Sequence, residues 1–133
     1  MAEDKVPQNR VLVVDDNEDV LEATAMLLRR SGYVVETASS AFEALERFTG
    51  TDGDEICVLI SDISMPGMNG YELARQLRQL PQCKTVVMIA LTGLSIYGDR
   101  ARALAAGFDD LIVKPIGPRS LIATIERLRK SRR

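Results

Sequence analysis

The sequence predicts an α/β fold, namely a single-domain, doubly wound, five-stranded parallel sheet with helices on both faces. Short apolar runs rich in β-branched residues alternate with segments of helical periodicity along the 133-residue chain. The runs are continuously apolar rather than alternating apolar and polar. Such runs are typical of strands in a parallel sheet whose two faces are both covered.

The first half of the chain contains three of the strands and two of the helices. The first helix is expected to begin at a cap formed by Asp16 or Asn17 and to end at Gly32. The second helix is expected to begin just after Ser40, because Ser40 and Glu43 have the spacing of a capping box. The predicted strands are "VLVV" (11–14), "YVVETA" (33–38) and "ICVLIS" (56–61).

The second half of the chain continues the alternation with two strands and three helices. The strands are "VVMIALT" (86–92) and "LIV" (111–113). Helices are expected over residues 71–79 and 97–106, the latter stopped by Gly107. A last helix places Leu121, Ile122, Ile125 and Leu128 on one face.

Composition narrows the functional classes. The formal net charge of −2 gives no reason to expect binding to nucleic acid or to a membrane. The chain has no histidine, which excludes a Ser-His-Asp triad, His-ligated zinc and a phosphohistidine on this chain. Cys57 and Cys83 form no Cys-x-x-Cys pair and are expected to be free thiols in a reducing cytoplasm. No apolar stretch is long enough to predict a membrane-spanning helix.

The carboxyl ends of the predicted strands carry the candidate functional residues. Ligands of an open parallel sheet bind outside these ends. The residues found there are Asp15, Asp16, Asp62, Thr92 and Lys114. Taken singly, each has an ordinary explanation as a helix cap, a turn residue or a solvated lysine. Their coincidence at one edge of the sheet favours a site.

The stretch "VLISDISMPGMNG" (58–70) places one of these carboxylates at the end of an apolar run. Pro66 fixes one backbone angle, while Gly67 and Gly70 permit backbone angles that other residues avoid. The turn is therefore expected to leave Asp62 accessible. Three neighbouring carboxylates repel one another without a cation. Mg²⁺, which prefers oxygen ligands and phosphate, is the natural partner, and Asp62 could then attack phosphorus beside Lys114 and Thr92.

These motifs resemble the receiver domain of two-component response regulators. The matching segments are "VLVVDDN", "LISDISMPGMNGYEL", "ALTG" and "AAGFDDLIVKPI". The resemblance implies a phosphoacceptor at Asp62, which would receive its phosphoryl group from a sensor histidine kinase or a histidine phosphotransfer protein. It implies an Mg²⁺ pocket, in which Mn²⁺ could substitute, formed by Asp15, Asp16, Asp62 and the backbone carbonyl of Ser64. Thr92 would be the switch hydroxyl and Lys114 the lysine that meets the phosphoryl group.

Two positions depart from the pattern that many receivers share. Leu111 stands where a Tyr or Phe is frequent, and Ile116 stands where transcription-factor receivers often have Phe. The combination is more similar to receivers of hybrid sensor kinases. The resemblance also implies self-catalysed phosphoryl transfer and autodephosphorylation rather than turnover of an external substrate.

Three alternatives remain open. A phosphatase of the haloacid-dehalogenase type also uses an Asp nucleophile with Mg²⁺, but its second Asp lies two residues after the nucleophile. A flavodoxin-like binding protein would share the fold, although "DDNED" (15–19) would repel a flavin phosphate. A degenerate receiver would serve only as a docking surface.

The expected organisation is a flexible leader over residues 1–9, a receiver domain over 10–130 and a basic tail over 131–133. The protein is expected to be cytoplasmic, and a monomer or weak dimer. It is expected to bind neither nucleic acid nor membrane directly.

Overall fold

The computed structural model describes residues 9–50, 55–93 and 98–131. They form one five-stranded parallel sheet in the order β2-β1-β3-β4-β5. The strands are β1 (Arg10–Val14), β2 (Val34–Ala38), β3 (Val58–Asp62), β4 (Val87–Thr92) and β5 (Asp110–Val113). The helices are α1 (Glu18–Arg30), α2 (Ala41–Thr49), α3 (Gly70–Arg78), α4 (Asp99–Ala106) and α5 (Pro118–Ser131), with a 3₁₀ turn, η3, at Pro81–Cys83. The predicted fold class is confirmed.

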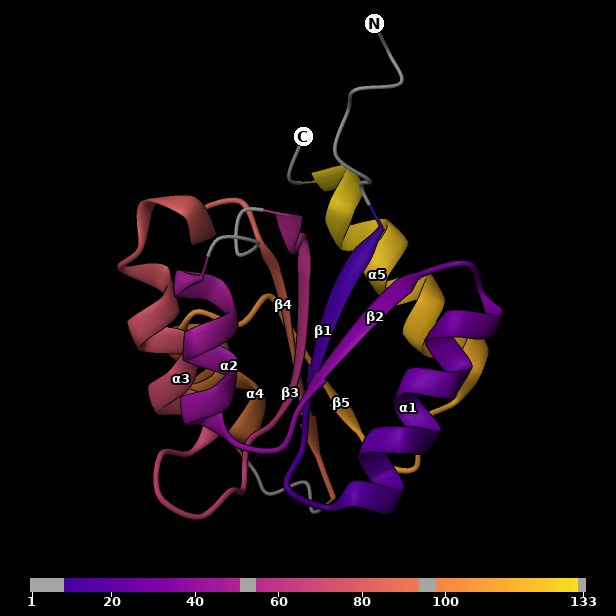
Figure 1. Ribbon diagram of the computed structural model, residues 1–133, viewed down its shortest axis with the longest axis horizontal. Helices are drawn as coiled ribbons and strands as arrows, with labels where there is room; N and C mark the ends of the chain where they lie inside the picture. The colour runs from indigo at the N-terminus through magenta and orange to yellow at the C-terminus, as the bar shows by residue number, and fades with distance from the viewer. Residues whose placement is uncertain (1–8, 51–54, 94–97, 132–133) are drawn as a thin grey trace, which may run out of the picture.

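Helices cover both faces of the sheet. Figure 1 shows α1 and α5 on one side and α2, α3 and α4 on the other. Each side buries its own apolar cluster, and the central strands β1, β3 and β4 contribute alternate residues to both. Every residue of β3 and β4 is buried, Asp62 and Thr92 included. This double burial explains why these strands are continuously apolar in sequence.

Most predicted helix boundaries agree with the structure to within two residues. Asn17 rather than Asp16 caps α1, since its side chain accepts the backbone N–H groups of Asp19 and Val20 at 3.0 and 3.1 Å. The helix ends at Arg30, before the predicted stop at Gly32. The expected start of α4 at residue 97 falls outside the described residues, and the helix is observed from Asp99.

The capping box lies on a different helix from the predicted one. Ser40 does accept the N–H of Glu43, but the Glu43 carboxylate turns to the N–H of Ser39 instead of completing the box. The reciprocal pair occurs at the start of α3, between Asn69 and Glu72. Two donors at that helix end are therefore satisfied, which fixes the start of α3 beside the end of β3.

Gly67 and Gly70 prove to have different roles. Gly67 has a φ of 77°, as expected for a turn glycine. Gly70 does not use its conformational freedom, because its φ is not positive. Glycine is required there by space, since a Cβ would lie 2.5 Å from the carbonyl oxygen of Asp62. The first turn of α3 can therefore approach the backbone at the end of β3.

Candidate functional site

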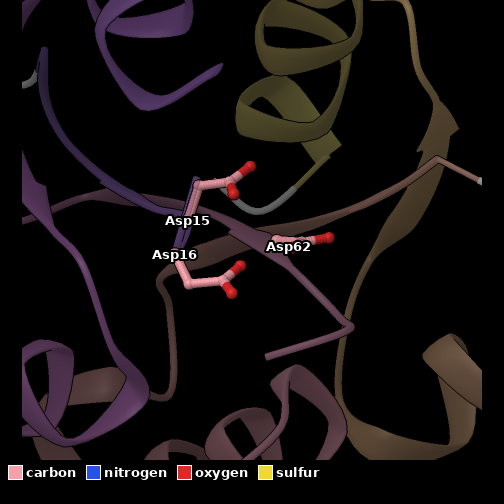
Figure 2. Close-up of side chains that lie close together, drawn as sticks. All are labelled: Asp15, Asp16 and Asp62. Carbon is pink, nitrogen blue, oxygen red and sulfur yellow. The ribbon is translucent and has the colours of Figure 1, made fainter. Parts of the chain in front are cut away.

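Three carboxylates meet at the carboxyl end of the sheet. Asp15 and Asp16 follow β1, and Asp62 is the last residue of the neighbouring strand β3. Figure 2 shows the three side chains close together, and one carboxylate oxygen from each lies within 4.8 Å of the others. Asp15 and Asp62 are buried, whereas Asp16 is exposed. The cluster thus has two fixed members and one facing solvent.

Lys114 is the cation of this cluster. Its ammonium nitrogen lies 2.9 Å from a carboxylate oxygen of Asp15 and 3.5 Å from one of Asp62. The other oxygen of Asp15 accepts the N–H of Asn17 at 2.9 Å. Asp15 is therefore engaged at both oxygens. In the part of the chain that the structure describes, Lys114 is the cation in ion-pair contact with two of these three carboxylates, so the cluster itself carries excess negative charge.

The end of β4 places Thr92 beside Lys114. The N–H of Lys114 donates to the carbonyl of Thr92 at 2.7 Å, which continues the β4–β5 pairing by one step. Similarly, the N–H of Ile63 donates to the carbonyl of Leu91 and continues the β3–β4 pairing. These backbone bonds hold the ends of three strands in register at the site.

A cavity of about 540 Å³ opens above these strand ends. All six predicted site residues line it: Asp15, Asp16, Asp62, Ser64, Thr92 and Lys114. The structure therefore brings together every residue that the sequence analysis proposed. Several lining residues were not predicted, namely Asn17, Val20, Ile63, Tyr71, Gly93, Asp99 and Arg102. Gly93 and Asn17 could have been found as neighbours of strand ends.

The environment of Asp62 disfavours its negative charge. Burial raises the pKa of its carboxyl above the ordinary value, and the Asp15 carboxylate raises it further. Lys114 and the backbone N–H of Ser64 oppose this shift without cancelling it, and Asp16 adds a smaller upward contribution. A second cation at the three carboxylates would relieve this repulsion. Carboxylate oxygens at this spacing suit a hard divalent ion such as Mg²⁺.

Comparison with known proteins identifies the family of the chain. Residues 11–126 match the family model of the response regulator receiver domain. The chain belongs to the response regulator receiver family. As a receiver, it takes the phosphoacceptor role in two-component signalling. Membership favours the receiver over the phosphatase and flavin-binding alternatives.

The similar proteins include a transcriptional regulator and a chemotaxis regulator. The chain is 39% identical over 127 residues to the transcriptional regulatory protein PrrA of Mycobacterium leprae, covering 96% of this chain and 52% of PrrA. It thus spans about half the length of that regulator. Among solved structures, the chemotaxis regulator CheY4 of Vibrio cholerae superposes with a TM-score of 0.81 at 32% identity, covering 90% of this chain and 97% of CheY4.

A third relative is the receiver domain of a histidine kinase from Syntrophus aciditrophicus. It superposes with a TM-score of 0.81 at 33% identity, covering 92% of this chain and 91% of that one. Receivers of regulators and of kinases therefore both resemble this chain, and the closer likeness to hybrid kinases stays a prediction. Among the described residues, no helix is both long and apolar enough to cross a membrane.

Proposed function

We propose that Asp62 is the phosphoacceptor and that it takes its phosphoryl group from a phosphohistidine of a sensor kinase or phosphotransfer protein. The observation that carries this is the position of Asp62: it ends a fully buried strand, lines the cavity and lies 3.5 Å from Lys114. Asp15 is less suited, because both of its oxygens already have partners and it is only 1% exposed.

The chemistry follows from the charge of Asp62. Its raised pKa reflects a carboxylate whose negative charge is poorly stabilised, which favours attack on an electrophile. A carboxylate oxygen forms a bond to phosphorus while the bond from phosphorus to the donor imidazole nitrogen breaks. The imidazole leaves with the electron pair of that bond and takes up a proton. Hydrolysis of the resulting acyl phosphate by water releases inorganic phosphate and returns the free carboxylate. Apart from the phosphoryl donor and water, the protein acts on no external substrate.

We propose that Asp15, Asp16, Asp62 and the backbone carbonyl of Ser64 hold Mg²⁺, with Mn²⁺ as a possible substitute. The ion supplies positive charge against which phosphoryl oxygens are oriented. Asp15 is held in place by Asn17 and Lys114, so the buried half of this ligand set is rigid before an ion arrives. Asp16, which is exposed, completes the set from the solvent side.

Lys114 and Thr92 are proposed to contact the phosphoryl group. Lys114 is poised to exchange its contact with Asp62 for a phosphoryl oxygen, because 3.5 Å is longer than its 2.9 Å contact with Asp15. The Thr92 hydroxyl is proposed to donate to a second oxygen. This contact would draw the end of β4 toward the site and signal phosphorylation to a partner protein.

We also propose the domain limits, the cellular location, the oligomeric state and the type of partner. The functional unit is residues 10–130, with a leader before it and a basic tail at 131–133. The protein acts in the cytoplasm as a monomer or weak dimer, and binds neither nucleic acid nor membrane directly. Its output follows from protein contacts that change on phosphorylation.

Phosphorylation of Asp62 can be tested with acetyl phosphate and Mg²⁺, followed by intact mass measurement. The wild-type protein should gain about 80 Da, the mass of one phosphoryl group. Asp62→Asn should gain nothing, while the control Asp19→Asn, which changes an exposed carboxylate of α1, should be labelled normally. Labelling of Asp62→Asn would assign the phosphoryl group to another residue. Absence of labelling in the wild type would favour a degenerate receiver.

A further inference from the structure

Tyr71 lies in the wall of the phosphoacceptor cavity, although the sequence analysis gave it no role. It is the second residue of α3, whose first turn is brought against the end of β3 by the close approach of Gly70. The side chain is only 6% exposed. It lines the cavity together with Asp62 and Thr92.

Within the described part of the chain, the hydroxyl group of Tyr71 has no hydrogen-bond partner. Its oxygen is buried, and no donor or acceptor among the described residues meets it. Buried polar groups are almost always hydrogen-bonded, and one left without a partner destabilises the fold. A phenylalanine would fill the same apolar surroundings without this cost. The hydroxyl therefore calls for a partner that is present in another state of the protein.

The ring of Tyr71 is held in place, so its hydroxyl is presented at a fixed position. The guanidinium carbon of Arg102, on α4, lies 4.5 Å from the centre of the ring. The ring also belongs to the buried cluster beneath α3 and α4, with Ala74 and Ala103. Burial raises the pKa of Tyr71, the Asp99 carboxylate raises it further, and Arg102 partly offsets both. The hydroxyl thus keeps its proton.

Thr92 lines the same cavity and can accept a hydrogen bond from this donor. Its side chain is 4% exposed. A threonine hydroxyl has one donor hydrogen and two acceptor lone pairs. Once its hydrogen is directed to a phosphoryl oxygen, its lone pairs can accept from a second hydroxyl. Chains of this kind strengthen each member.

We propose that Tyr71 is a positioning residue of the phosphorylated state, in which its hydroxyl donates to Oγ of Thr92 while Thr92 donates to a phosphoryl oxygen on Asp62. This inference rests on the proposed function of Asp62 and Thr92. It predicts that the Tyr71 hydroxyl has opposite effects in the two states. Without phosphate it is an unpaired buried group that lowers stability, and with phosphate it is a bonded group that raises it.

Tyr71→Phe separates these two effects, because it removes the hydroxyl and keeps the ring under Arg102. The variant and the wild type are compared by melting temperature without ligand, and by affinity for beryllofluoride with Mg²⁺, a stable mimic of the phosphoryl group. We expect an unchanged or higher melting temperature without ligand. The affinity for beryllofluoride should fall about tenfold, the scale of one hydrogen bond in a charged network. Tyr33→Phe, a change just before β2 and outside the cavity, is the matched control. It should leave the affinity for beryllofluoride unchanged, and its effect on stability should be the same with and without the ligand.

The route through Thr92 is tested by repeating the change in a Thr92→Ala background. If Tyr71 acts through Thr92, Tyr71→Phe should have no further effect on beryllofluoride affinity in that background. A tenfold loss in both backgrounds would overturn the route, and so would a lower melting temperature of ligand-free Tyr71→Phe. Equal affinity of Tyr71→Phe and wild type would overturn the inference alone, provided that Asp62→Asn binds no beryllofluoride. Binding by Asp62→Asn would instead overturn the proposed function.

Discussion

The Arg78–Asp109 ion pair at the amino end of the sheet and the Lys114 cluster at the carboxyl end are both partly buried, but only in the first does one cation face one carboxylate. At the amino end, the guanidinium of Arg78 lies 3.0 Å from the carboxylate of Asp109. The same guanidinium donates to the carbonyls of Gly107, Cys83 and Val86 at 2.8 to 2.9 Å. The Asp109 oxygen also accepts the N–H of Met88. One cation here matches one carboxylate, and the remaining donors are used on backbone carbonyls.

At the carboxyl end, a single lysine faces three carboxylates. Lys114 contacts Asp15 and Asp62, and Asp16 adds a third negative charge within the same cluster. A lysine is a point charge, whereas an arginine presents several donors in a fixed plane. At the amino end, the Arg78 guanidinium thus links α3, β4 and the loop before β5, and its charge is matched by that of Asp109. The carboxyl end is left with excess negative charge, which a cation can neutralise.

The largest change in the free energy of unfolding is expected from removing the Arg78–Asp109 ion pair. Arg78→Met should lower the free energy of unfolding by about 3–5 kcal/mol, because Asp109 loses its ion pair and three carbonyls lose the guanidinium donors. Arg75→Met is the matched control, since Arg75 is exposed on the same helix. The control should change stability by about 0.5 kcal/mol or less. Urea unfolding measures both, and equal losses would show that the Arg78 contacts add little.

A smaller effect of the opposite sign is expected at the unbalanced end. Without metal at neutral pH, Asp62→Asn should raise the free energy of unfolding by about 1 kcal/mol, because it removes one of three repelling charges. The pKa of Asp62 is raised in the folded protein. As the pH falls through that raised pKa, the folded wild type takes up a proton before the unfolded chain does. Its stability should therefore rise relative to the variant until the ordinary carboxyl pKa is reached. If the stability difference between Asp62→Asn and the wild type instead widened on acidification, this prediction would be wrong.

The same contrast explains what could be predicted from the sequence. Asp15, Asp62, Thr92 and Lys114 were predicted correctly as neighbours because each ends or follows an apolar strand, and parallel strands end at one edge. Arg78 was not singled out, because a basic residue in the last turn of a helix already has an ordinary explanation. Its partners come from three separate segments, which no local pattern reveals.

Tyr71 and Arg102 were missed for a related reason. Both reach the cavity from helices, and helical periodicity predicts which face is buried but not which side chains meet across it. The capping box was assigned to Ser40 and Glu43, where the spacing fits but the carboxylate has a competing donor at Ser39. A spacing rule cannot identify such competition.

If the three carboxylates form a cation site, Mg²⁺ should stabilise the wild type but not Asp16→Ala, which can be measured by thermal melting. Asp16 is exposed, so its removal should leave the fold intact while depriving the cluster of its solvent-facing ligand. Millimolar Mg²⁺ should raise the melting temperature of the wild type, because an ion that binds only the folded state stabilises it. We expect Asp16→Ala to show no such rise, although its metal-free form should be at least as stable as the wild type. An equal Mg²⁺-induced rise in both proteins would contradict a cation site at Asp15, Asp16 and Asp62.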